Sequence, residues 1–405
     1  MERLRAWKVV RFEVAGRNVE VGRLLQDFRL MVNKAVRFGL LNRCSSLGAI
    51  SRGVYRGLRA EHQVYSQHVS QACAVAASIL RNYRKRLRRG LRSNPPFVKR
   101  LFARIENQAY TLDRTRGVLR FPIRAGTQIT IQLPLSEYHR SILSDPAIKL
   151  GSLTLTESIV ALAVSRDSPR ELVPTSIVAF DTNESSMDGV LATRFGLTAV
   201  KVPFPEVRQI QATHFRRRRR LGSKKAHDRR TQAALLSKEG RRERRRINYR
   251  IHEVTNAIIG TAMATRSAIA IEDLRGLRPQ SWSKQLNRRL AQWPRRRIHS
   301  LLEHKARWRG IPLIKVNPKN TSRTCPACGF LANSRKGAMS AEMKFRCRCG
   351  WSADRQTNAA LNILKTAIAR DTALARAVRF QPGAMRHDVV ILQPVTRRLE
   401  MSRTL

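Results

Sequence analysis

The most informative scarcity in this sequence is that of acidic residues. Its 405 residues include 28 Asp or Glu against 79 Lys or Arg, which gives a formal net charge of +51. A compact chain tolerates such self-repulsion best beside a polyanion, so nucleic acid is the expected partner. An anionic membrane surface is the alternative that charge alone leaves open.

Long apolar runs are also missing. No stretch approaches the roughly 20 apolar residues that a membrane-spanning helix needs, and no signal-like apolar segment follows the start. The 42% of apolar residues is enough for folding, and the length suits two or three domains. We therefore expect a soluble, cytoplasmic protein with no membrane partner, associated with the nucleoid in a prokaryote.

Cysteine is scarce too, but four of the six cysteines fall within 25 residues. In an intracellular chain this clustering favours a metal site over disulfides. Cys325 and Cys328 form a Cys-x-x-Cys pair followed by glycine, which is typical of zinc sites. Their partners, Cys347 and Cys349, are separated by one residue instead of two. Two interpretations stay open: a four-thiolate zinc site, or a weakened or metal-free ribbon.

The first half of the chain predicts strands interrupted by helices. Residues 1–15 alternate like a strand, and residues 24–92 show helical spacing. Short strand patterns separated by turn signals return from about residue 108. The expected fold is a β-barrel or sheet with a helical insertion.

The second half predicts an RNase H-like fold. An apolar strand at 176–180 is followed by strand patterns at 188–195 and 196–204, joined by tight turns. Helix, strand, helix, strand and helix patterns come next, and the clustered cysteines precede the last helix. An antiparallel meander followed by this alternation is the order expected of an RNase H-like fold with an insertion.

A basic segment from residue 216 to 250 carries 16 Lys or Arg and three acids. For any single arginine, a solvated surface position is the simpler interpretation. Together they predict a surface that contacts phosphates. The logarithm of the binding constant should then fall with the logarithm of the salt concentration, with a slope of roughly −0.9 per neutralised duplex phosphate, or about −0.7 for single strands. The candidates are Arg216, Arg217, Lys224, Lys225, Arg241, Arg242 and Arg245.

Few acids are available for catalysis. An RNase H-like nuclease needs carboxylates from several elements around two divalent ions roughly 3.5 to 4 Å apart. Asp181 ends the first strand, Glu272 and Asp273 end the fourth, and Asp354 precedes the last helix. Each acid also has an ordinary interpretation: Asp181 as a turn residue, Asp273 as a solvent-facing strand end, and Asp354 as a helix N-cap. Glu272 and Asp273 point to opposite faces of their strand, and the pattern does not choose between them.

Four stretches carry a resemblance to the transposon-encoded TnpB nucleases and the related compact type V CRISPR effectors. They are IVAFDTNE (177–184), IAIEDLRGL (269–277), VNPKNTSRTCPACG (316–329) and FRCRCGWSADRQTNAALNI (345–363). The last two are the specific ones, because TSxxCxxCG followed by CGxxxDRxxNAAxNI is a long pattern. The resemblance covers about residues 175–369, and in the first half it is one of layout only.

The resemblance implies an RNA-guided, Mg-dependent endodeoxyribonuclease with guide RNA and target DNA as partners. Its RuvC-like site would consist of Asp181, Glu272 and Asp354 holding two Mg²⁺ ions, with a structural Zn²⁺ on the four clustered cysteines. The implied layout is a wedge-like β-barrel at 1–20 and 100–172, a helical recognition region at 21–99, a RuvC-like nuclease domain at 173–320 and 350–380, and a zinc ribbon at 321–349. Residues 381–405 carry no recognisable motif and are expected to form a C-terminal tail.

Three positions depart from the family pattern. Asn183 stands where many members have glycine, Gln356 stands where an acid is expected, and the second cysteine pair is one residue short. Two other functions therefore stay open beside the guided endonuclease. One is a guided DNA-binding regulator without cleavage, and the other is an unguided, transposon-associated nuclease.

Overall fold

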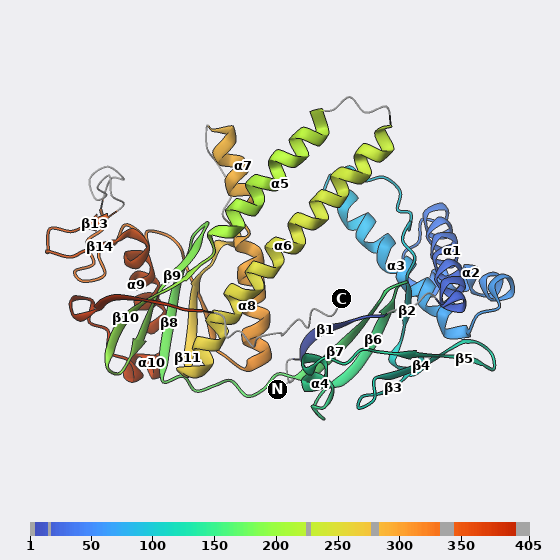
Figure 1. Cartoon of the computed structure of the whole chain (residues 1–405), viewed down its shortest axis with the longest axis horizontal. Coiled ribbons are helices and arrows are strands. Elements are labelled where there is room, and N and C mark those ends of the chain that lie inside the picture. Colours follow the sequence, from blue (N-terminus) through green and yellow to red (C-terminus); the bar gives the residue numbers. More distant parts are fainter. Residues whose placement is uncertain (1–4, 15–17, 224–227, 277–282, 333–343, 394–405) are drawn as a thin grey trace, which may run out of the picture. The chain divides into compact units, whose positions relative to one another are not determined.

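Figure 1 presents the computed structural model, which describes residues 5–14, 18–223, 228–276, 283–332 and 344–393. The chain divides into two compact units, residues 1–167 and 168–405. Both units mix helices with strands, which confirms the expected mixed α/β, multidomain class. In the described ranges, no helix combines the length and the apolar character needed to cross a membrane.

The first unit combines three long helices with two antiparallel sheets. Its sheets have the strand orders β1-β7-β6-β2 and β3-β4-β5. Among the described strands neither sheet closes on itself, so the wedge-like barrel stays a prediction. The elements are β1 (Arg5–Glu13), α1 (Val19–Leu41), α2 (Leu47–His62), α3 (Ser66–Arg88), β2 (Ala103–Ile105), β3 (Thr111–Asp113), β4 (Val118–Arg124), β5 (Thr127–Gln132), α4 (Glu137–Leu143), β6 (Lys149–Leu155) and β7 (Ile159–Asp167).

The second unit is organised around a six-stranded sheet with the order β12-β11-β8-β9-β10-β15. Strands β8, β9 and β10 form an antiparallel meander, while β11 and β12 run parallel to β8. The elements are β8 (Ser176–Thr182), β9 (Ser186–Thr193), β10 (Gly196–Pro203), α5 (Pro205–Ser223), α6 (Arg229–Ala264), β11 (Ser267–Glu272), α7 (Lys284–Gln292), α8 (Arg295–Arg309), β12 (Leu313–Val316), β13 (Lys344–Arg346), β14 (Ser352–Asp354), α9 (Arg355–Ile368), α10 (Thr372–Ala377) and β15 (Arg386–Ile391).

The sheet of the second unit is buried on both faces, because its central strands are apolar throughout. All residues of β11 are buried, and their side chains alternate between two cores. One core lies under α9 and the other under α6 and α8. Strands β8 and β9 also approach closely: a Cβ added at Gly189 would lie 2.5 Å from the backbone oxygen of Ala179. Glycine at this position therefore permits the pairing.

The prediction that residues 381–405 form a C-terminal tail is wrong for part of this segment. Residues 386–391 form β15, which pairs in parallel with β10 at the edge of the six-stranded sheet. The segment lacks a motif, but its HDVVI run supplies extended, partly apolar backbone. An unpaired sheet edge offers hydrogen-bonding groups to any such strand, so no specific motif is needed for it to join.

Candidate active site and metal centre

Two of the three predicted acids lie side by side in the sheet. Asp181 is in β8 and Glu272 is the last residue of β11. The parallel register pairs Phe180 with Ile271, so the next position along brings Asp181 level with Glu272. Their neighbours of the same parity belong to the core under α9. Both carboxylates therefore occur on the sheet face that α9 covers.

The structure distinguishes the two adjacent acids that the sequence pattern could not. Glu272 is buried, and Thr321 donates a hydrogen bond to it over 2.6 Å. Asp273 belongs to the opposite face and forms an ion pair of 2.5 Å with Arg275. The hydrogen bond from Arg275 lowers the pKa of Asp273 to about 2. Only Glu272 shares a sheet face with Asp181.

The carboxyl group of Asp181 is held in an unfavourable place for a negative charge. Burial, followed by the charges of Glu272 and Asp188, raises its pKa to about 7. A hydrogen bond from Asn183 and the charge of Arg355 act in the opposite direction. Burial also raises the pKa of Glu272. This clustering of like charges in a dry place favours the binding of protons or cations.

A fourth carboxylate, Asp188, belongs to the same cluster and was not among the predicted residues. It is the direct cross-strand partner of Asp181 in the antiparallel β8–β9 pair, so both side chains share a face. It is buried and accepts hydrogen bonds from Asn183 over 2.9 Å and from Ser186. Lys201 lies 3.0 Å away as its counter-ion. Asn183, one of the departures from the family pattern, thus links the two aspartates.

A signal for this fourth carboxylate was available in the sequence. The stretch SMDGVLAT forms a strand, in which Asp188 shares parity with the apolar residues Val190 and Ala192. An acid at an inward position of a strand requires partners or a function, because burying an unpaired charge is costly. The register that places it against Asp181 required the structure.

We predict that Asp188→Asn lowers the pKa of Asp181, because it removes one of the two negative charges that raise it. A carboxyl group with a raised pKa binds protons in the folded state that the unfolded chain has already lost. The free energy of unfolding should therefore fall as pH rises from about 4 to about 7. Between pH 4 and 7 the free energy of unfolding of the variant should fall by less in total than that of wild type, in urea titrations without magnesium. An equal total loss would contradict the prediction.

Asp354 connects the cluster to α9. It is the exposed N-cap of this helix and accepts a hydrogen bond of 3.0 Å from the backbone N–H of Gln356. In the orientation that lets its nitrogen donate, the Gln356 amide also bonds both Asp354 oxygens. The next residue, Arg355, lies close enough to lower the pKa of Asp181 by its charge. The start of α9 is therefore beside the buried acids, with Asp354 in its ordinary capping role.

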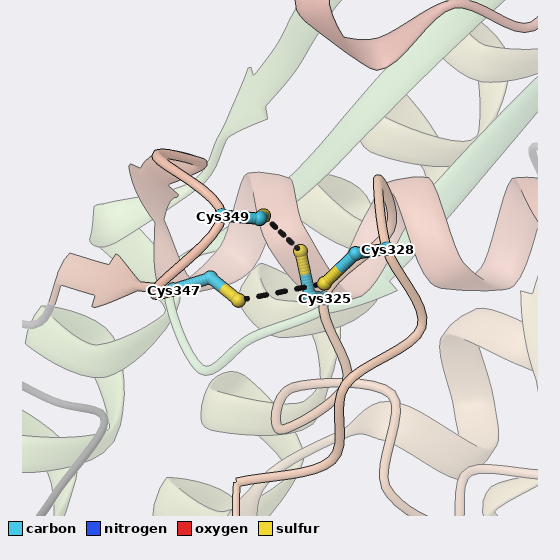
Figure 2. Close-up of side chains that lie close together, drawn as sticks. All are labelled: Cys325, Cys328, Cys347 and Cys349. Atoms are coloured by element: carbon cyan, nitrogen blue, oxygen red, sulfur yellow. Dashed lines mark hydrogen bonds between the residues drawn. The ribbon is translucent and has the colours of Figure 1, made fainter.

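Figure 2 shows the four clustered cysteines pointing toward one another from two loops. Their sulfur atoms all lie within 4.8 Å of one another. Two pairs are 3.6 Å apart, Cys325 with Cys349 and Cys328 with Cys347, too far for disulfides, whose sulfurs are about 2.05 Å apart. Zn–S bonds of about 2.3 Å in a tetrahedron separate the sulfurs by roughly 3.8 Å. The cluster fits Zn²⁺, and the one-residue spacer does not prevent convergence.

The thiols of this cluster differ in acidity. Burial raises the pKa of Cys325 to about 12. The pKa of Cys328 is instead lowered to about 7, mainly by a hydrogen bond from the backbone N–H of Phe330. Thiolates are the metal-binding form, so Zn²⁺ binding would release protons.

Among the described residues, no other group of three or more Cys, His, Asp or Glu gathers closely enough to hold one ion.

The ribbon is attached to α9 by asparagines of the NAALN motif. Trp351, which follows the last cysteine pair, donates to Asn358 over 3.0 Å. Asn358 donates to the backbone oxygen of Thr324, as does Asn362, over 2.9 and 2.7 Å. Both asparagines are buried. They therefore join the loop before Cys325 to the helix that begins at Asp354.

The basic segment forms a helical pair, α5 and α6, which extends away from the sheet of the second unit in Figure 1. A buried hydrogen bond of 2.7 Å between His214 and Glu239 joins the two helices, together with an ion pair between Arg218 and Glu243. Five of the seven predicted basic residues are exposed on it: Arg216 and Arg217 on α5, and Arg241, Arg242 and Arg245 on α6. Lys224 and Lys225 lie outside the described residues.

Comparison with known proteins identifies the class. Residues 296–363 match the family model described as Cas12f1-like, TNB domain, and residues 24–119 match the Uncharacterized protein MJ0013 family. The fold is similar to a chain in the cryo-EM structure of the Cas12f1-sgRNA-target DNA complex. That similarity has a TM-score of 0.59 at 15% identity and covers 85% of this chain and 82% of that chain. The chain therefore shares its fold with Cas12f1 over most of its length.

Sequence relatives include TnpB-like proteins and CRISPR-associated endodeoxyribonucleases. The TnpB-like protein MJ0751 of Methanocaldococcus jannaschii is 23% identical over 246 residues, covering 58% of this chain and 86% of that protein. The CRISPR-associated endodeoxyribonuclease Cas12f2 of a Micrarchaeota archaeon is 29% identical over 155 residues, covering 33% of this chain and 28% of that protein. These matches support the relationship to the TnpB family and to the type V effectors that the sequence motifs predicted.

Proposed function

We propose that this protein is an RNA-guided DNA endonuclease whose catalytic acids are Asp181, Glu272 and Asp354. The observation that carries the proposal is the pairing of Asp181 and Glu272 on one face of the sheet. The helix that begins at Asp354 covers that same face. Carboxylates from two strands and a helix are the ligand set that a RuvC-like nuclease needs.

The architecture supports assigning the second unit as the RuvC-like domain. Three antiparallel strands are followed by two strands parallel to the first, and helices cover both faces of the sheet. This is the RNase H-like order. The zinc ribbon would then be an insertion between β12 and α9, and the first unit would supply the wedge and the helical recognition region.

The acids suit Mg²⁺, which prefers carboxylate oxygens in proteins. The raised pKa values of Asp181 and Glu272 indicate negative charge that a divalent ion would neutralise. In a two-metal site, the ions lie roughly 3.5 to 4 Å apart, so the three carboxylates need not converge on one point. When bound, such ions activate water and stabilise the leaving oxygen of a phosphodiester.

The protein's own contribution is to position these oxygens. Thr321 fixes one Glu272 oxygen by its 2.6 Å hydrogen bond, which leaves the second oxygen available. Asn183 bonds the Asp181–Asp188 pair, and Lys201 neutralises Asp188 from the other side. Asp354 is held at the helix N-terminus, where the helix dipole stabilises its charge. For Asp181 and Glu272, these hydrogen bonds act against the burial that raises the pKa of both carboxyl groups.

The partners follow from charge and from the relatives. The Cas12f1 chain of similar fold is in a complex with a single guide RNA and target DNA. In this chain the exposed arginines of α5 and α6 supply phosphate contacts without sequence information. Base pairing between guide and target would supply specificity, while the protein holds the heteroduplex by its backbone. A net charge of +51 suits that division of labour.

The decisive experiment is to express the chain with its native flanking DNA, sequence the RNA that copurifies, and offer matched target DNA with Mg²⁺. We expect one defined RNA and cleavage only of matched DNA next to a short flanking motif. Copurification of heterogeneous RNA, with cleavage that ignores sequence, would support the unguided nuclease instead. Guided binding without cleavage, unchanged by Asp181→Ala, would identify a regulator.

A further inference from the structure

A cavity between α5 and α6 lies apart from both the acidic cluster and the cysteines. Its volume is about 670 Å³, within the roughly 300–1,000 Å³ of small-ligand pockets. Residues of both helices line it, including Arg217, Arg245, Arg246, Arg250 and Tyr249. The buried pair between His214 and Glu239 joins the same two helices and fixes their spacing. The cavity is therefore a preformed feature of the helical pair.

The cavity wall is strongly cationic. Four arginines line it against one acid, Glu206. Arg250 is engaged by Glu253 over 2.8 Å, and Arg217 lies 3.6 Å from Glu239. Arg245 and Arg246 form no ion pair with any described residue, so their charges are available to an anion from outside. Guanidinium groups favour phosphate because they offer several donors in a fixed plane.

An aromatic ring and neutral polar groups complete the wall. Tyr249 is 63% exposed, with the Arg250 guanidinium 5.7 Å from the centre of its ring, and the ring is a platform for a flat group. Gln209 and Thr213 offer donors and acceptors, and Ile210 gives an apolar floor. The lone acid, Glu206, disfavours a second phosphate but can accept a hydrogen bond from a sugar hydroxyl. Together these groups match a nucleotide: phosphate, base and ribose.

We propose that this cavity binds one unpaired nucleotide of a single-stranded RNA segment, with the base stacked on Tyr249 and the phosphate on Arg245 and Arg246. A base within a duplex is covered on both faces and cannot reach such a platform, whereas an unstacked base in single-stranded RNA can. The Glu206 carboxylate favours ribose over deoxyribose through the 2′-hydroxyl. The inference rests on the proposed function in taking this strand from the guide RNA.

The test measures the affinity of the full-length protein for a short labelled single-stranded RNA, for DNA of the same sequence, and for free uridine monophosphate. Tyr249→Ala should weaken RNA binding about tenfold, because base stacking is lost, while Tyr249→Phe should bind like wild type. The exposed position of Tyr249 makes a folding defect unexpected, and a thermal melt checks it. Crosslinks from thiouridine-substituted RNA should map to the peptide containing Tyr249.

A matched charge control lies on the same helix. Replacing Arg245 and Arg246 by glutamine should weaken RNA binding and reduce its salt slope by about 0.7 per lost phosphate contact. Arg230→Gln, an exposed arginine about 22 Å away along α6 from Arg245, should change the affinity less than twofold. An equal loss in both cases would overturn the proposal in favour of nonspecific charge.

Other outcomes also decide the matter. Equal RNA affinity for wild type and Tyr249→Ala overturns the proposal, as does a loss confined to DNA or to the free nucleotide. If Tyr249→Ala has no effect while Asp181→Ala still stops guided cleavage, the cavity assignment fails and the nuclease assignment stands. If RNA binding depends on Tyr249 but no DNA is ever cut, the cavity assignment stands and the nuclease assignment fails.

Discussion

Glu272→Gln is expected to reduce target DNA cleavage by about 10³-fold or more, while Asp273→Asn, one residue further along, leaves cleavage almost unchanged. The two acids are adjacent in the chain but belong to opposite faces of the sheet. Glu272 lies beside Asp181 on the face under α9, and Asp273 is paired with Arg275 on the other. A loss of several kcal/mol of charge stabilisation in the transition state corresponds to a rate factor of this size.

The measurement is the single-turnover cleavage rate of matched DNA, alongside the affinity of each variant for guide RNA and target. Because glutamine keeps the size of Glu272 and can still accept the hydrogen bond from Thr321, folding and target binding should be retained. Equal cleavage by both variants would remove Glu272 from the active site. Loss of activity in Asp273→Asn alone would identify Asp273, and not Glu272, as the catalytic acid.

The order of elements along residues 176–368 and the family resemblance could be predicted because they depend on local patterns. Apolar runs, turn signals and the long cysteine motifs each identify an element without reference to the rest of the chain. The parity argument for Glu272 and Asp273 gave opposite faces but not which face meets Asp181. That choice depends on the register between β8 and β11, which the sequence alone does not determine.

Three features of the structure depend on contacts between different elements. The place of Asp188 beside Asp181 follows from the β8–β9 register, and β15 joins the sheet by backbone pairing that carries no motif. The NAALN asparagines were recognised only as part of a family pattern. Their physical role is to bond the backbone of the ribbon loop from buried positions on α9. In each case the contact joins two different elements, and their pairing cannot be derived from either segment alone.

Cys349→Ser is expected to reduce bound zinc from about one per chain to almost none and to lower the melting temperature by about 10 °C. Cys349 is exposed, so the substitution removes a ligand without opening a cavity in the core. Structural zinc sites contribute about 10–16 kcal/mol in small peptides. If roughly 3 kcal/mol of this is lost to the second unit, the shift is about 10 °C at 2–4 °C per kcal/mol.

Cleavage should fall in the same variant, because the cysteine loops contact both ends of the proposed active site. Trp351 and Asn358 connect the last cysteine pair to α9, whose N-cap is Asp354, and Thr321 before the first pair bonds Glu272. Cys44→Ser is the matched control, since Cys44 belongs to the first unit and has no neighbouring thiol among the described residues. Zinc content by mass spectrometry, thermal melts and cleavage rates should all be unchanged in it. A wild-type protein that purifies without zinc yet cuts DNA at full rate would show that the thiols hold the ribbon together unaided.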